Sequence, residues 1–239
     1  MTKSISSEKH FTWRGRDVTR LENLSDIVFA LSLTLIVASS VPTNFDALVA
    51  LWREAIAVAF CFALILLIWS KHHAFHRRYG LDDGPTVFLN SIVLFLIMIF
   101  AYPLKYLALF MVNFFTGYFE SGPQIMAVMP LDRVDIFITI YSVGYAAVFG
   151  IFALLYAHAL KRADDLELTE AERILTRLEV DQGISAIIIS SLAAIIALSL
   201  PDRWSPVGGA TYFLIGPVMM WLTRRARKRA DTVQDSAGG

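Results

Sequence analysis

The segment RLENLSDIVFALSLTLIVASSVP, residues 20–42, begins with charged residues and continues as an apolar run. After Asp26, the nineteen residues from Ile27 to Phe45 carry no charge. A helix of roughly 20 mostly apolar residues is long enough to cross the hydrocarbon core of a bilayer. The segment therefore predicts a membrane-spanning helix with a serine, Ser25, and an aspartate near its charged end.

The whole chain shares this apolar character. Of its 239 residues, 56% are hydrophobic and 18% are charged, which is too apolar for an ordinary soluble domain. Its single cysteine, Cys61, excludes an intrachain disulfide. Acidic residues precede the first span, unlike the start of a cleavable signal peptide, so we expect this span to be retained.

Six stretches are long and apolar enough to span a membrane or nearly so: 22–41, 48–71, 86–109, 134–160, 182–200 and 207–223. We therefore expect an all-α integral membrane protein with six transmembrane helices.

The basic residues predict the orientation of these spans. Seventeen of the 21 lysines and arginines precede the first span or follow the second, fourth and sixth. The other four are Arg53, Lys105, Arg133 and Arg203. Because cytoplasmic loops are enriched in basic residues, both termini are expected in the cytoplasm, and an even number of spans agrees with this.

This layout predicts three regions. Residues 1–19 form a cytoplasmic N-terminal segment, residues 20–223 the six-helix transmembrane domain, and residues 224–239 a basic and then polar cytoplasmic tail. The tail begins RRARKR. Such a run would suggest nucleic-acid binding in a soluble protein, but directly after a last span it indicates a topological stop signal and contact with membrane lipid. No nucleic-acid partner is expected.

With about 100° of rotation per residue, two stripes run along the first span. Ser25, Ser32 and Ser39 share one face, and small residues let membrane helices approach closely, so this face is expected to pack on a neighbour. The other stripe is mostly apolar. It either faces lipid or the protein core, or it forms a pore wall whose leucines make a hydrophobic constriction, which can gate ions by dewetting. This stripe contains Ile27, Leu31, Thr34 and Ala38.

Asp26 needs a partner, because an ionised carboxylate about one turn into a span is costly when unpaired. Arg20 lies six residues earlier on a different face and is not a good same-helix partner. The second span ends in WSKHHAFHRR, residues 69–78, on the same side of the membrane. We expect a polar layer that joins Asp26 and Ser25 to His72 or His73 and that responds to pH.

The three histidines of residues 69–78 also suggest a metal site. No cysteine or carboxylate close in the sequence completes a ligand set, so the hydrogen-bonded layer is the preferred interpretation and no metal is expected.

The two polar segments together resemble the transmembrane protein 175 family, the lysosomal potassium channels and their bacterial relatives. The family signature Arg-x-x-x-Phe-Ser-Asp is similar to the start of the first span, and a Trp…His-His…Phe pattern is similar to the end of the second. The matching residues are Arg20, Leu24, Ser25 and Asp26, then Trp69, His72, His73 and Phe75.

The resemblance implies a passive cation channel, permeable to potassium and other monovalent cations, that needs no cofactor. It implies a multi-pass protein of the bacterial inner membrane, because a single six-helix repeat resembles the bacterial members, which assemble as homotetramers. It also implies that the first helix lines the pore and that the polar residues brace the helices. The implied pore residues are Leu31 and Thr34, then Ile27, Leu35 and Ala38. The implied bracing residues are Arg20, Ser25, Asp26, Trp69, His72 and His73.

Two features qualify the resemblance. Leu24 stands where the signature has phenylalanine, so the aromatic packing on the second helix is lost or replaced, which affects gating more than fold. No TVGYG-type filter is present in the sequence, so selectivity arises elsewhere. Asp46 and Asp132 are expected to line an acidic outer mouth.

Two other classes of protein compete with a channel. A secondary transporter would use helices broken by glycine or proline, and these residues are present, but no acid lies in the middle of a span. A membrane enzyme has only the histidine cluster in its favour, with no nucleophile or ligand set beside it and no nucleotide-binding loop. The favoured interpretation is therefore a channel and not an enzyme.

Overall fold

The computed structural model describes residues 11–15, 17–38, 43–116, 133–201 and 204–237. The described residues form helices joined by short connections, with no β-strand among them. In chain order the elements are α1 Arg20–Ala38, α2 Phe45–Arg53, α3 Ala55–Tyr79, α4 Gly84–Thr116, α6 Val134–Lys161, α7 Glu170–Ser199, α8 Pro206–Ala210, the 3₁₀ helix η2 Thr211–Leu214, and α9 Ile215–Ala237.

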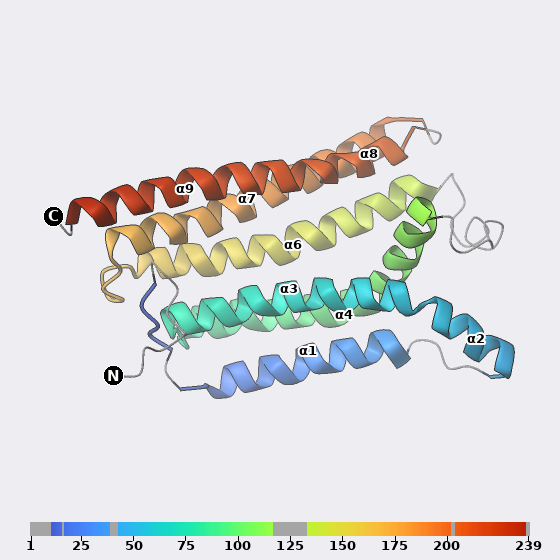
Figure 1. The fold of residues 1–239 in the computed structure, drawn as a ribbon, viewed down its shortest axis with the longest axis horizontal. Coiled ribbons are helices and arrows are strands. Elements are labelled where there is room, and N and C mark those ends of the chain that lie inside the picture. Colours follow the sequence, from blue (N-terminus) through green and yellow to red (C-terminus); the bar gives the residue numbers. More distant parts are fainter. Residues whose placement is uncertain (1–10, 16, 39–42, 117–132, 202–203, 238–239) are drawn as a thin grey trace.

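The long helices lie side by side in one bundle (Figure 1). α1 occupies one edge and packs on α3 and α4, while α6 packs between α4 and α7, and α9 covers α7. At one end of the bundle three helices begin, namely α1, α4 and α7, and three others end, namely α3, α6 and α9. We call this the basic end, because it carries Arg77, Arg78, Lys161 and Arg162.

Five helical segments are long and apolar enough to cross a membrane, namely α1, α3, residues 84–101 of α4, α6 and α7. The expected sixth stretch, 207–223, is divided among α8, η2 and the first part of α9. Pro206 opens α8, and Pro217 lacks the N–H that an uninterrupted helix would use. Gly208 lets α8 approach α7, because a Cβ there would lie 2.6 Å from the carbonyl oxygen of Ala193.

The second expected span begins later than the sequence pattern predicted. Residues 45–53 form the separate helix α2, and the spanning helix α3 starts only at Ala55. Glu54 at this break forms an ion pair with Lys105 of α4, with Oε2 and Nζ 2.8 Å apart. The predicted start at residue 48 was wrong, because that residue lies in α2, which ends at Arg53 before the spanning helix begins.

α4 changes direction near its middle (Figure 1). Pro103 lies inside the helix and removes one backbone hydrogen bond, which kinks an α-helix. The hydroxyl of Tyr141 on α6 donates to the carbonyl oxygen of Pro103, so the kink is held by a neighbouring helix.

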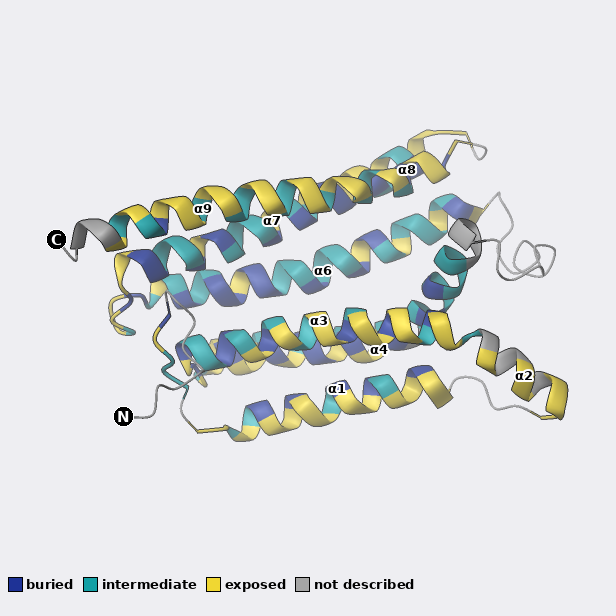
Figure 2. Ribbon diagram, in the orientation of Figure 1, coloured by how far each residue is buried: buried dark blue, intermediate teal, exposed yellow. Residues whose placement is uncertain are grey.

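Burial is uneven across the bundle (Figure 2). The core gathers where α3, α4, α6 and α7 meet, around Phe75, Tyr79 and Tyr156. α1 is buried along one face only, and large apolar side chains are exposed on nearly every long helix. A chain with so much exposed apolar surface requires lipid or further protein around it.

Candidate functional site

α1 begins with a capping box. The backbone N–H of Thr19 donates to Oε2 of Glu22 at 2.9 Å, and the N–H of Glu22 donates to the hydroxyl of Thr19 at 3.2 Å. These two bonds satisfy N–H groups that the first turn of a helix leaves without partners. The start of α1 is thus specified by a Thr-x-x-Glu pattern immediately before the apolar run.

The two stripes of α1 have different surroundings. The buried face carries Ser25, Phe29, Ser32 and Ile36, and it lies against α3 and α4. The hydroxyls of Ser25 and Ser32 donate to carbonyl oxygens one turn earlier, at 2.8 and 2.9 Å, so these small side chains add no unsatisfied donor at the contact. The other stripe is exposed in the single chain. Its residues are Ile27, Leu31, Thr34, Leu35 and Ala38.

A chain of hydrogen bonds passes through Asn90 of α4. Nε2 of His72 lies 2.6 Å from Oδ1 of Asn90, and because a carbonyl oxygen only accepts, the histidine donates. Nδ2 of Asn90 donates to the hydroxyl of Ser25 at 3.1 Å, and that hydroxyl donates to the carbonyl oxygen of Leu21. All three side chains are buried, so this chain joins α1, α3 and α4 through groups that water does not reach.

Asp26 binds a different partner from the one expected. The indole N–H of Trp69 donates to Oδ1 of Asp26 at 2.8 Å. His73 stacks on the Trp69 ring, with centroids 5.3 Å apart and planes 18° from parallel. The structure therefore brings Asp26, Trp69 and His73 together on the exposed side of the α1–α3 contact, while Ser25 and His72 meet on the buried side.

Two signature residues lie outside these contacts. Arg20 is exposed and makes no hydrogen bond or ion pair with the described part of the chain. Leu24, at the position of the signature phenylalanine, is 51% exposed. Phe29 instead packs on His72, with ring centroids 5.6 Å apart, so an aromatic contact between α1 and α3 exists one turn further along α1.

His76 extends the histidine row into the core. It is buried, its ring centroid lies 4.6 Å from that of His72, and its Nε2 has no hydrogen-bond partner among the residues that the structure describes. No group of three potential metal ligands occurs in the described ranges. The unpaired nitrogen is enclosed mainly by aromatic rings, including that of Phe75.

Asn90 is the functional residue that the sequence reasoning missed. A signal was present, because FLNSIV places an amide inside an otherwise apolar span, and such a group needs buried partners. Its partners come from two other helices, so spacing along one helix does not identify them.

The chain is similar to known proteins over most of its length. The family model for the endosomal/lysosomal potassium channel TMEM175 matches residues 20–101, which contain α1, α3 and the first part of α4. A potassium channel of Marivirga tractuosa is 35% identical over 233 residues, covering 95% of this chain and 94% of the relative. The chain belongs to the TMEM175 family. The resemblance read from the sequence is thereby confirmed.

A further relative and a solved structure support the membership in TMEM175. A potassium channel of Chamaesiphon minutus is 27% identical over 163 residues, which is 64% of this chain and 71% of the relative. A crystal structure of the potassium channel MtTMEM175, solved as a variant with a nanobody–MBP fusion protein, superposes with a TM-score of 0.82 at 34% identity. That match covers 93% of this chain and 99% of the other. The chain is a multi-pass membrane protein of this channel family and not an enzyme.

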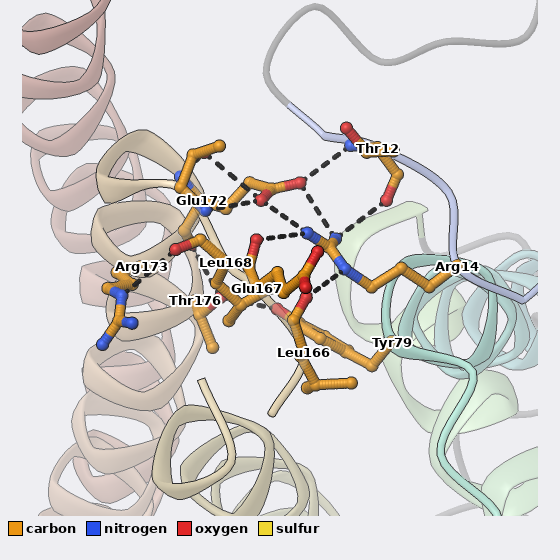
Figure 3. Close-up of polar contacts among 10 residues, drawn as sticks. Thr12, Arg14, Tyr79, Leu166, Glu167, Leu168, Glu172, Arg173 and Thr176 are labelled. Atoms are coloured by element: carbon orange, nitrogen blue, oxygen red, sulfur yellow. Dashed lines mark hydrogen bonds and ion pairs between the residues drawn. The ribbon is translucent and has the colours of Figure 1, made fainter. Parts of the chain in front are cut away.

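The TMEM175 chain also carries a second polar cluster at the basic end (Figure 3). Residues 11–15, which we call the N-terminal clamp, lie between the end of α3 and the start of α7. Arg14 donates to both carboxylate oxygens of Glu172 and to the carbonyl oxygens of Leu166 and Glu167. The backbone N–H of Thr12 donates to Oε1 of Glu172 at 2.8 Å.

The N-terminal clamp also binds the end of α3. The N–H groups of Arg14 and Gly15 both donate to the carbonyl oxygen of Arg77 at 3.2 Å. Phe11 is buried, with its ring 5.9 Å from that of Tyr79. Gly15 is required for this approach, because a Cβ there would lie 2.4 Å from the carbonyl oxygen of His76.

A third polar contact links α4 to α6. Asp83, just before α4, accepts hydrogen bonds from the backbone N–H and hydroxyl of Thr86 and from Arg162, and it contacts Nε2 of His158 at 2.8 Å. Burial would raise the pKa of Asp83, but the bonds from Thr86, His158 and Arg162 hold it well below its usual range. The carboxylate is therefore ionised at all ordinary pH values.

Proposed function

We propose that this chain conducts potassium passively through a central pore lined by α1 of each subunit in a homotetramer. The observation that carries the proposal is the asymmetry of α1. Its buried face is fixed to α3 and α4 by Ser25, Phe29 and the Asn90 chain, whereas the opposite stripe is exposed in the single chain. α1 also lies at an edge of the bundle, where several copies can converge on one axis (Figure 1).

In this arrangement Leu31 forms the hydrophobic constriction. It is 52% exposed in the single chain, and four copies around an axis would make a ring of leucines. A narrow apolar ring excludes water and so resists the passage of hydrated ions until it widens. Ile27 and Leu35, one turn away on either side, extend the apolar wall, and Ala38 leaves more room further along.

Thr34 supplies the polar group next to this ring. It lies three residues beyond Leu31, about 4.5 Å along the helix axis. Its hydroxyl donates its proton to the carbonyl oxygen of Ala30 at 3.0 Å, so the lone pairs of the oxygen stay available. Oxygen lone pairs suit a monovalent cation that has lost part of its hydration, and they offer nothing to an anion.

We also propose six membrane crossings with both termini in the cytoplasm of a bacterium. The sixth crossing would be residues 206–223, where α8, η2 and the start of α9 follow one another. The basic end would face the cytoplasm, because basic residues concentrate there. Asp46, exposed in the first turn of α2, would then lie near the outer mouth, whereas Asp132 falls outside the described residues.

The test is potassium flux into liposomes that contain the purified protein, with sodium as the comparison ion. Leu31→Ala is expected to raise the flux because the constriction widens. The matched control is Leu154→Ala on α6, since Leu154 is 53% exposed and lies on a helix whose main contacts are with α4 and α7. Unchanged flux in Leu31→Ala, or an equal rise in the control, would remove Leu31 from the constriction.

A further inference from the structure

A shallow groove of about 310 Å³ runs between α6 and α7 at the basic end. The helices α6 and α7 are separated from α1 by α3 and α4 (Figure 1). Two parts of the groove differ in chemistry. One part is apolar, and the other carries two cations and one carboxylate. The apolar side chains are Ala157, Leu160, Val180 and Ile184, and the charged ones are Lys161, Arg177 and Asp181.

The cations lie near the ends of two helices that are long and apolar enough to span a membrane. Lys161 is the last residue of α6, and Arg177 lies two turns into α7. Ala157 and Ile184 lie further along the same two helices, toward the middle of the bundle. Basic side chains above an apolar groove match the amphiphilic shape of a phospholipid, which has an anionic headgroup above acyl chains.

The neighbouring basic residues are already neutralised. Arg14 is paired with Glu172, Arg162 with Asp83 and Asp165, and Arg173 with Asp164. Lys161 and Arg177 are exposed and have no hydrogen-bond or ion-pair partner within the described ranges. Lys161 and Arg177 therefore remain available to bind an anion, and both line the same groove.

Asp181 limits where an anion can bind. Its carboxylate lines the groove one turn beyond Arg177, toward the middle of the bundle. An anion placed deep in the groove would meet this negative charge, whereas one placed between Lys161 and Arg177 meets two positive charges first. The charge pattern thus favours a headgroup at the rim and apolar chains below.

We propose that this groove binds one acidic phospholipid of the leaflet at the basic end. The phosphate lies between Lys161 and Arg177, and an acyl chain follows Leu160, Val180 and Ile184. The proposed site does not depend on where the pore lies.

The experiment is native mass spectrometry of the purified full chain in detergent, titrated with phosphatidylglycerol and, separately, with phosphatidylcholine of the same acyl chains. The test variant is Lys161→Gln combined with Arg177→Gln. The control, Arg227→Gln combined with Lys228→Gln on α9, removes the same charge at the same end. The variant Lys161→Arg combined with Arg177→Lys keeps both charges.

The dissociation constant for phosphatidylglycerol is expected to rise about tenfold or more in the test variant, because this variant removes both positive charges that contact the phosphate in the proposed site. The control and the charge-keeping variant are expected to stay within about twofold of the parent, and phosphatidylcholine is expected to bind equally weakly to all four proteins. Equal loss in test and control would overturn the site, because the attraction would then be general. An altered oligomeric state with unchanged lipid affinity would also overturn it and assign the groove to a contact between subunits.

Discussion

Arg14 and Glu172 form an ion pair across 158 positions of sequence, with Nη1–Oε1 and Nη2–Oε2 distances of 3.0 and 2.8 Å. Glu172 also closes the capping box of α7 with Thr169, and its side chain is only 1% exposed. Arg14 lies just before α1, and within the membrane region α1 packs on α3 and α4. The pair therefore ties the segment that leads into α1 to α7, a helix that is not among the main contacts of α1.

We predict that Glu172→Gln destabilises the protein by about 2 kcal/mol, because Arg14 loses the partner that offsets its partial burial. A fall in the thermal midpoint of the purified protein, followed by intrinsic tryptophan fluorescence, measures this loss. Glu170→Gln is the control, since Glu170 is exposed in the same first turn. Equal midpoints for the two variants would show that the clamp contributes no stability.

Asn90→Ala is expected to lower the free energy of unfolding by about 2–4 kcal/mol, because it leaves buried Nε2 of His72 without its acceptor and removes the donor to the Ser25 hydroxyl. Ser91→Ala removes a polar group from the next position, where the side chain is exposed and bonds only its own helix. The measurement compares the thermal midpoints of Asn90→Ala and Ser91→Ala in the same detergent. A loss no larger for Asn90→Ala than for Ser91→Ala would contradict a structural role for the network.

Asp26→Asn is expected to weaken the proposed tetramer more than it changes ion selectivity. Asparagine keeps an oxygen for the indole N–H of Trp69 but removes the charge, and the exposed carboxylate has further lone pairs for a neighbouring subunit. Mass photometry of the detergent-solubilised protein measures the tetramer fraction, and liposome flux measures selectivity. A normal tetramer fraction in Asp26→Asn would argue against this role.

Asp83 is expected to stabilise the folded protein at neutral pH and to lose this effect in acid. The pKa of Asp83 in the folded protein lies below its value of about 3.9 in the unfolded chain. The stabilisation that the ionised carboxylate provides is therefore fully present above about pH 3.9, and it is lost as the pH falls toward the folded pKa. Asp83→Asn is expected to lower the thermal midpoint by about 3 °C at neutral pH, and the difference from the parent should shrink below about pH 4.

The control for this prediction is Asp82→Asn, an exposed neighbour with no partner within the described segments. It is expected to show no such difference at any pH. If the gap between Asp83→Asn and the parent persisted unchanged at pH 3, the stabilisation would come from something other than the carboxylate's charge.

Much of this protein could be predicted from local sequence. Five of the six expected spans correspond to long apolar helices, because unpaired backbone groups are costly in lipid and a helix pairs them within its own segment. The two faces of α1 also followed from sequence, since helical rotation alone separates the serines from the leucine and threonine stripe. The family was evident because its signature residues lie close together along two short segments.

Other features depended on which helices meet. The break at Glu54, the place of Asn90, and the partners of Arg14 each involve a charged or amide group that needs a counterpart on a distant segment. A sequence shows that such a group must be satisfied but not by which residue, because the partner is chosen by packing in three dimensions. The helices and their faces were therefore determined locally, whereas the pairing of their buried polar groups was decided only by the tertiary structure.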